Sequence, residues 1–270
     1  MNKLFEQYIK TDMLPTLFCP GCGNGIVQMA AIEAIDKLGL QDDLACVSGI
    51  GCSSWIPCYL ELDVMHTMHG RALAFAQGLK LARPDKKIMV FTGDGDCLAI
   101  GGNHFLHAAR RNMDMTVILV NNYIYGMTGG QKSPSTPEGA ITKTSPFGAM
   151  DTPLDGCELA IAAGATYVAR WTTAHPVQLE RAIEEGLMHN GFAFIEVLCQ
   201  CPVQAGKKVY GVKEPAEIMA MYKESTYIQR EGMEPQPGKT RIGLLKQDKE
   251  AAEYTDRVAA MMEAQGYRRG

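Results

Sequence analysis

Two apolar segments in the middle of the chain each lead into residues that can bind a cation. Residues 88–91 are apolar and precede Gly93-Asp94-Gly95-Asp96, and the apolar residues 115–120 precede Asn121-Asn122. We predict that both segments are parallel strands, joined by a helix over about residues 98–112. Open parallel sheets bind ligands beyond the carboxyl ends of their strands. The spacing therefore predicts that Asp94 and Asn122 meet in one crevice.

The residue types at this crevice favour a diphosphate that is held through Mg²⁺. Asp94 offers an anionic oxygen and Asn122 a neutral carbonyl oxygen, while Mg²⁺ prefers oxygen ligands completed by phosphate and water. Gly93 and Gly95 allow the backbone to approach a phosphate closely. The alternative is two ordinary turns that end strands and bind nothing. A Gly-Asp-Gly turn alone is a weak signal, but the later Asn-Asn pair makes the spacing resemble the thiamine diphosphate motif.

A second group of candidate ligands consists of thiols at predicted turns and strand ends, namely Cys19, Cys22, Cys52 and Cys201. A Cys-x-x-Cys pair can hold two corners of a metal centre, and single thiols from distant loops can supply the others. Four thiolates suit either zinc or an iron–sulfur cluster. Cys199 is an alternative fourth ligand. Of the other cysteines, Cys46, Cys97 and Cys157 fit small buried hydrophobic residues better, and Cys58 fits either role.

Composition narrows the class of protein. The chain has 270 residues, of which 46% are hydrophobic, enough for one large domain or two small ones. The net charge of −4 gives no support for nucleic-acid or anionic-membrane binding. The polar start lacks a signal core, and no apolar run approaches the ~20 residues of a membrane span. We therefore predict a cytoplasmic protein, in which nine cysteines indicate metal binding or catalysis rather than disulfides.

Helical and strand patterns alternate along the first three quarters of the chain. Their order predicts an α/β fold with a mostly parallel sheet and helices on both faces. Further helices are expected at about 24–38, with Asn24 as N-cap, and at 72–82, 158–163 and 177–189, and further strands at 44–48, 166–169 and 192–198. The first 17 residues look like a polar lead-in, and the long loop 126–154 is expected to cover a ligand.

We predict two units. Residues 1–206 would form the α/β domain with the cysteine-bearing loops, and residues 207–270 a C-terminal extension that is helical in part. Within the extension we expect helices at about 216–223 and 249–265, with an extended Pro/Gly segment at 234–238 between them.

Five motifs in order point to a known family. They are Cys-Pro-Gly-Cys-Gly, Gly-Ile-Gly-Cys-Ser, His-Gly-Arg-Ala, Gly-Asp-Gly-Asp and Asn-Asn-x-Ile-Tyr-Gly-Met-Thr-Gly-Gly-Gln. Over about residues 18–202 the chain resembles the β subunits of 2-oxoacid:ferredoxin oxidoreductases, which bind thiamine diphosphate (TPP). It is most similar to the 2-oxoglutarate:ferredoxin oxidoreductases.

The resemblance implies a role for each motif. Mg²⁺ would be held by Asp94, Asn122 and the backbone carbonyl of Ile124, and a [4Fe–4S] cluster by Cys19, Cys22, Cys52 and Cys201. The diphosphate would lie against Gly93, Gly95, Asp96 and the turn formed by Tyr125, Gly126, Met127 and Thr128. The rest of the cofactor would be lined by Gly49, Ile50, Gly51, Cys52 and Ser53.

The His-Gly-Arg motif is placed beside the cofactor by the same resemblance. His69, Gly70 and Arg71 would lie near the phosphates or the reacting end, with His69 as the catalytic candidate. The alternatives are that His69 caps the helix that follows and that Arg71 makes a surface ion pair.

The implied reaction is the oxidative decarboxylation of a 2-oxoacid to acyl-CoA and CO₂. The best candidate for the substrate is 2-oxoglutarate, followed by branched-chain 2-oxoacids and pyruvate. Electrons would leave singly through the cluster to ferredoxin. Activating the cofactor needs a carboxylate on its aminopyrimidine, yet Glu33 and Glu61, the nearest in sequence, look structural. In the family that glutamate comes from an α subunit, so we expect such a partner, with γ and δ subunits as further possible partners.

Three other functions compete with this interpretation. A non-oxidative TPP decarboxylase or synthase subunit would use Asp94 and Asn122 but leave the thiols idle. A zinc-binding scaffold subunit would use the thiols alone. A dinucleotide-dependent dehydrogenase ranks last, because the glycines do not form Gly-x-Gly-x-x-Gly after the first strand.

Overall fold

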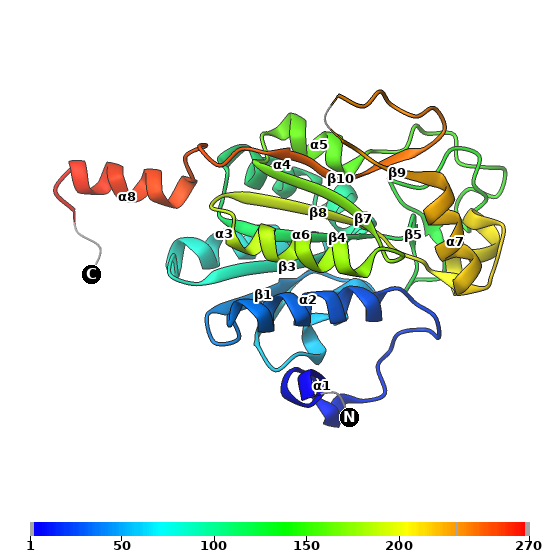
Figure 1. Ribbon diagram of the computed structural model, residues 1–270, viewed down its shortest axis with the longest axis horizontal. Coiled ribbons are helices and arrows are strands. Elements are labelled where there is room, and N and C mark those ends of the chain that lie inside the picture. Colours follow the sequence, from blue (N-terminus) through cyan, green and yellow to red (C-terminus); the bar gives the residue numbers. More distant parts are fainter. Residues whose placement is uncertain (1–2, 231, 268–270) are drawn as a thin grey trace.

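A twisted, mostly parallel sheet runs through the centre of the molecule (Figure 1). The computed structural model describes residues 3–230 and 232–267. Within these residues the main sheet has eight strands in the order β2-β1-β3-β4-β8-β7-β10-β9. Residues 1–2, 231 and 268–270, which belong to the two units expected from the sequence, lie outside the described residues.

The elements of the described chain follow the predicted alternation. The strands are β1 (Leu44–Ser48), β2 (Asp63–His66), β3 (Lys87–Gly93), β4 (Met115–Asn121), β5 (Ile124–Tyr125), β6 (Gln131–Lys132), β7 (Tyr167–Thr172), β8 (Phe192–Leu198), β9 (Thr226–Ile228) and β10 (Thr240–Gln247). The α-helices are α1 (Lys3–Tyr8), α2 (Asn24–Leu38), α3 (Ala72–Ala82), α4 (Gly102–Arg111), α5 (Gly156–Ala163), α6 (Pro176–Met188), α7 (Pro215–Ser225) and α8 (Tyr254–Ala264).

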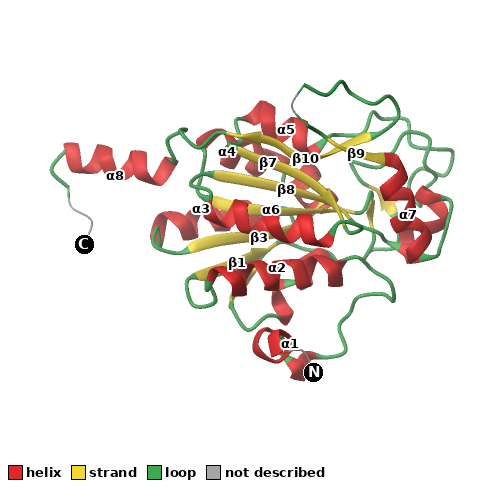
Figure 2. Cartoon of the chain, in the orientation of Figure 1, coloured by secondary structure: helices red, strands yellow, loops and turns green. Residues whose placement is uncertain are grey.

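Helices cover both faces of the sheet (Figure 2). On one face, α2 and α6 pack over Met89 and Phe91 of β3, and on the other, α3 and α4 pack over Ile88 and Val90. Consecutive β3 residues thus enter opposite cores, as the alternation of side chains along a strand requires. The central strands are buried and mostly apolar because both faces are covered. The predicted α/β class with a mostly parallel sheet is confirmed.

The order of the strands creates a crevice at their carboxyl ends. From β1 the chain first adds β2 on one side and then returns to add β3 on the other. Gly93, the last residue of β3, is paired with Val120 of β4. Asp94 and Asn121 therefore leave adjacent strands side by side, at a point where ligands bind in open α/β sheets.

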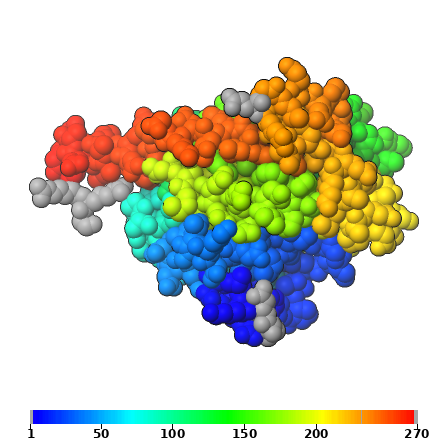
Figure 3. All heavy atoms as spheres, in the orientation of Figure 1, coloured from blue at the N-terminus to red at the C-terminus, as the bar shows by residue number. Residues whose placement is uncertain are grey.

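The C-terminal segment adds two strands to the same sheet. β10 pairs antiparallel with β7, and β9 lies beyond it. Figure 3 shows this segment as a continuous band along one edge of the molecule, with α8 projecting past the body. The expected terminal helix begins at Tyr254 rather than near residue 249, because the Glu253 side chain caps it by accepting from the Asp256 amide at 2.9 Å.

Several local expectations are wrong. Gly23, not Asn24, is the N-cap residue of α2, and Asn24 is its first helical residue. The lead-in is not merely polar, since it forms α1 and buries Tyr8 and Ile9 in the core. The helix expected at 98–112 is preceded by a wider π-helical segment, Gly95–Ile100, before α4 begins. The loop 126–154 contains β6, which pairs with β5.

No helix of the described chain is both long and apolar enough to cross a membrane.

Candidate functional site

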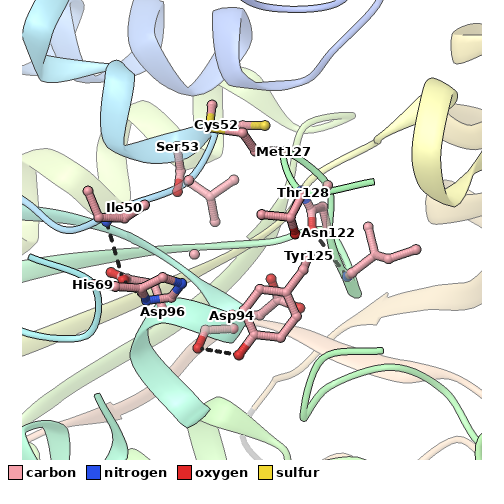
Figure 4. Close-up of a pocket in the computed structure, with 16 residues that line it drawn as sticks. Ile50, Cys52, Ser53, His69, Asp94, Asp96, Asn122, Tyr125, Met127 and Thr128 are labelled. Carbon is pink, nitrogen blue, oxygen red and sulfur yellow. Dashed lines mark hydrogen bonds and ion pairs between the residues drawn. The ribbon is translucent and has the colours of Figure 1, made fainter. Parts of the chain in front are cut away.

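A pocket lies beyond the carboxyl ends of β1, β3 and β4 (Figure 4). It encloses about 530 Å³ of space not occupied by atoms, part of which is open to solvent. It is lined by fifteen residues predicted from the sequence and by Val120: Ile50, Gly51, Cys52, Ser53, His69, Gly93, Asp94, Gly95, Asp96, Val120, Asn122, Ile124, Tyr125, Gly126, Met127 and Thr128. Segments far apart in the sequence thus converge on one space.

Asp94 is one of two buried acids that line this pocket. It is 2% exposed, and one carboxylate oxygen, Oδ2, accepts hydrogen bonds from the hydroxyls of Ser133 and Ser135. Burial raises the pKa of Asp94 to about 6, against the opposing effect of the two serine hydrogen bonds. A bound cation would offset this desolvation and favour the ionised form.

Asn122 presents its amide on the neighbouring strand end. Its side-chain oxygen accepts from the Ile124 amide at 3.2 Å, which fixes the tight turn into β5. A carbonyl oxygen has two lone pairs, so one remains for a ligand. Together with the carboxylate of Asp94, this donor set fits a hard cation such as Mg²⁺.

Glycines form the wall on which a phosphate group could rest. A Cβ on Gly95 would lie 2.3 Å from the Tyr125 ring, whose hydroxyl donates to the Gly95 carbonyl at 3.0 Å. A Cβ on Gly93 would lie 3.3 Å from Oγ of Ser53. At Gly95 in particular, close contact with Tyr125 leaves no room for a side chain.

Asp96 lines the pocket, but its oxygens are occupied by the protein. Its carboxylate accepts from the amides of Ile50 (3.3 Å) and Gly70 (2.7 Å) and from the Thr92 hydroxyl (2.8 Å). Its Oδ1 also lies 2.7 Å from Nδ1 of His69, without the alignment of a hydrogen bond. Asp96 thus ties the segment after β3 to the loops that carry Ile50 and Gly70, and its place against the diphosphate stays a prediction.

Three predicted cofactor residues lie outside the pocket wall. Gly49 and Gly70 pack behind it, because a Cβ on Gly49 would lie 2.0 Å from Asp96 and one on Gly70 would lie 2.5 Å from Ile100. The Arg71 guanidinium donates to the Ile100 carbonyl at 3.3 Å. Arg71 therefore bonds to the end of the Gly95–Ile100 segment. It does not line the pocket, and its expected place beside the cofactor stays a prediction.

Two of the four predicted thiols lie next to the pocket, and all four interact electrostatically. The sulfurs of Cys201 and Cys52 lie 3.7 and 3.9 Å from the position of a Cβ on Gly126. The pKa of Cys22 is raised to about 12 and that of Cys52 to about 11, first by burial and also by negative charge on the other thiols of this set, which includes Cys19. Metal coordination removes such protons outright.

The spacing of these thiols bears on the kind of metal centre. No three of the four sulfurs lie within 4.8 Å of one another, although all four residues are described. A single tetrahedral zinc ion, with Zn–S bonds of about 2.3 Å, holds its sulfurs about 3.8 Å apart. No three of the described sulfurs of this set are therefore as close together as the ligands of one zinc ion.

Cys199 and Cys201 occupy different surroundings. Cys199 is 1% exposed and belongs to the hydrophobic core beneath α2, where its sulfur lies 3.9 Å from the side-chain oxygen of Asn24. Cys201 packs beside Ile124 at the pocket, near Cys52.

Sequence reasoning missed the two serines that contact Asp94. Ser133 and Ser135 lie in the loop 126–154, where serine, threonine and proline ordinarily indicate turns. Val120, the last apolar residue before Asn121, was also missed as a wall residue. Only the proximity of the loop to the strand ends could have suggested these contacts.

Comparison with known proteins agrees with this geometry. Residues 49–197 match the family model described as "Thiamine pyrophosphate enzyme, C-terminal TPP binding domain". The chain is 56% identical to the 2-oxoglutarate synthase subunit KorB of Methanocaldococcus jannaschii over 82% of each chain. It is 38% identical to the 2-oxoacid:ferredoxin oxidoreductase subunit beta of Saccharolobus solfataricus, covering 90% of this chain and 85% of that one.

A solved structure extends the similarity to the whole fold. A chain of the 2-oxoglutarate:ferredoxin oxidoreductase from Magnetococcus marinus superposes with a TM-score of 0.89 at 32% identity, covering 98% of this chain and 91% of that one. That structure is described as having 2-oxoglutarate, coenzyme A and succinyl-CoA bound. The sequence and structural similarities together show that the chain belongs to the TPP-binding β subunits of the 2-oxoacid:ferredoxin oxidoreductase family.

Proposed function

We propose that this chain is the β subunit of a 2-oxoglutarate:ferredoxin oxidoreductase. The complex would convert 2-oxoglutarate and coenzyme A into succinyl-CoA and CO₂. Two electrons would leave one at a time through a [4Fe–4S] cluster to ferredoxin. The choice of substrate rests on relatives that are named for 2-oxoglutarate and align over most of the chain.

One observation carries the proposal: Cys52 belongs to both the pocket and the thiol set. It lines the same cavity as Asp94 and Asn122, and its sulfur shares the space beside Gly126 with that of Cys201. A cluster on these thiols would therefore lie against the cofactor pocket. Electron transfer slows steeply with distance. A cluster that shares Cys52 with the cofactor pocket would therefore be close enough to accept single electrons from the cofactor.

The residues of the pocket would divide the work of binding. Asp94, Asn122 and the Ile124 carbonyl would hold Mg²⁺, while Gly95 and the turn through Met127 would receive the diphosphate. When bound, TPP supplies the electron sink that allows a 2-oxoacid to lose CO₂. The His69 ring lines the same pocket with Nδ1 toward Asp96, and its other nitrogen would move a proton at the bound substrate.

A partner would complete the site. No glutamate of the described residues lines the pocket, and Glu33 and Glu61 lie outside its wall. We propose that an α subunit contributes the carboxylate that activates the aminopyrimidine. Turnover would then require the complex, and oxidation of 2-oxoglutarate by the purified chain alone would contradict this part of the proposal.

The decisive test is anaerobic purification of the tagged chain with its native partners. Iron, acid-labile sulfide and TPP would be quantified, and viologen reduction would be followed with 2-oxoglutarate, pyruvate and a branched-chain 2-oxoacid in the presence of coenzyme A. We expect about four irons per cluster on this chain and the fastest reduction with 2-oxoglutarate. A colourless, iron-free complex that still decarboxylates would instead indicate a non-oxidative TPP enzyme, and a preference for pyruvate would change the substrate.

A further inference from the structure

Two serines from the long loop hold Asp94, one of the two buried acids of the pocket. Ser133 and Ser135 are 3% and 2% exposed, and both place a hydroxyl on the same oxygen of Asp94, with the Ser135 contact at 2.7 Å. Both hydroxyls use Oδ2, so Oδ1 accepts neither of them and can offer a lone pair to a cation. Mg²⁺ keeps near-ideal octahedral geometry, for which one oxygen per carboxylate is the usual contribution.

The local structure of the loop keeps both hydroxyls in place. The Thr136 hydroxyl accepts from the Ser133 amide at 2.9 Å and donates to the Tyr123 carbonyl at 2.6 Å. Pro134 stiffens the backbone between the two serines, whose hydroxyls are 3.2 Å apart. The turn is thereby fastened to the segment that follows β4.

The direction of the Ser135 hydrogen bond follows from its neighbours. A serine hydroxyl has one proton, yet Ser135 lies within 2.9 Å of the side-chain oxygen of Asn121 as well as near Asp94. The Asn121 oxygen already accepts from the Tyr123 amide at 3.1 Å, and its amide group donates to Glu196 at 2.7 Å. The Ser135 proton is therefore free to go to Asp94, the charged acceptor.

We propose that Ser133 and Ser135 are positioning residues for the metal ion. They fix the carboxylate of Asp94 so that Oδ1 faces the cation, and they couple cation binding to the ordering of residues 131–137. The inference rests on the proposed function, because it concerns the same Mg²⁺ and TPP. The loop 126–154 would then orient a metal ligand in addition to covering the cofactor.

The test measures binding in the full chain within its purified complex. Mg²⁺ would be titrated at saturating TPP by calorimetry, with Mn²⁺ and electron paramagnetic resonance as a second probe. Substituting groups that orient metal ligands typically weakens metal binding about 10–100-fold. We expect that loss for the double variant Ser133→Ala/Ser135→Ala and a smaller loss for each single variant. Ser135→Thr, which keeps a hydroxyl, should stay close to the natural protein.

A matched control lies in the same loop. The backbone of Ser145 makes hydrogen bonds with Thr142 and Gly148. Because these bonds do not use its hydroxyl, Ser145→Ala should leave Mg²⁺ affinity unchanged. Amide hydrogen exchange gives a readout independent of activity: Mg²⁺ with TPP should protect residues 131–137 in the natural protein but not in the double variant.

The outcomes separate the two proposals. If the natural protein shows no Mg²⁺-dependent TPP binding, the proposed function itself fails. If it does bind, but the double variant binds Mg²⁺ within about twofold of it or keeps the same protection, the positioning role is overturned. Should the double variant not fold, the single variants decide in the same way, since each retains one hydroxyl on Asp94.

Discussion

Asp96 places a carboxylate oxygen 2.7 Å from Nδ1 of His69, and the same oxygen accepts the amide of the next residue, Gly70. The contact joins the segment after β3 to the loop before α3. It directs one nitrogen of the imidazole toward a buried anion, so that the other is left for the pocket. We therefore expect Asp96 to act on the site through His69, since direct contact with phosphate would bring two negative charges together.

The first prediction concerns this pair. Asp96→Asn keeps the shape of the side chain and an oxygen for the amides of Ile50 and Gly70 but removes the negative charge beside His69. We expect it to fold with a loss of about 1–2 kcal/mol and to lower the rate of viologen reduction by the complex. In a double-mutant cycle with His69→Gln, the two rate losses should not add, because both act through one imidazole.

The control for that cycle is Asp85→Asn. Asp85 is exposed and pairs with Arg83 at the surface, away from the pocket, so its substitution should leave the rate unchanged. Fully additive losses for Asp96→Asn and His69→Gln would show that Asp96 does not work through His69.

The fourth thiol ligand is the subject of a second prediction. Cys201 lies near Cys52 at the pocket, whereas Cys199 is packed in the core. Cys201→Ser should therefore lose most of the iron and the visible absorption of the anaerobically purified protein. Cys199→Ala should retain both, with some loss of thermal stability because a buried side chain is shortened. Iron analysis and the spectrum of the dithionite-reduced protein make the comparison, and the reverse pattern would assign the ligand to Cys199.

Asp94 makes cation binding depend on pH. Because burial raises its pKa to about 6, the carboxyl group becomes protonated as the pH falls through that value, and a protonated carboxyl is a poor ligand. Mg²⁺ affinity at saturating TPP should fall by about tenfold per pH unit below about pH 6. Titrations from about pH 5 to pH 7 test this, and an affinity that is flat over the range contradicts it.

The same group has the opposite effect on the metal-free protein. Its folded-state pKa of about 6 lies above the ordinary value of 3.8, so the folded state binds the proton more tightly than the unfolded state does. This contribution to stability is complete below the ordinary value and is lost as the pH rises through about 6. Asp94→Asn should remove that part of the pH dependence, as seen in the thermal midpoint of the apo protein.

The sequence predicted the parts of this fold that are strongly apolar and periodic. β1 and α3 begin and end as expected, and the adjacency of Asp94 and Asn122 follows from two buried strands with a helix between them. It could not reveal β2 or β10, because both strands are partly exposed and carry mixed side chains without a clear period. Their place is decided by pairing with β1 and β7.

The site shows the same division. Asp94, Asn122, Gly93 and Gly95 were predicted from their spacing at strand ends, and the other motif residues that line the cavity were implied by the family resemblance. Ser133 and Ser135 were not, because a hydroxyl that reaches a residue about 40 positions earlier leaves no local pattern. The place of Arg71 beside the cofactor was implied by the resemblance and stays a prediction, while its guanidinium donates to the carbonyl of Ile100 at the end of a helical segment.

A last prediction tests the glycine wall. Gly95→Ala would place a Cβ 2.3 Å from the Tyr125 ring, so the ring or the backbone must shift, and we expect the shift to distort the wall that would receive the diphosphate. We expect TPP binding to fall below detection by calorimetry while the protein remains folded. Gly25→Ala is the matched control: a Cβ there meets nothing within 4 Å, and in α2 alanine should stabilise the protein by about 0.5–1 kcal/mol without affecting TPP. If Gly95→Ala bound TPP as tightly as Gly25→Ala does, the segment after β3 would not form the seat of the diphosphate.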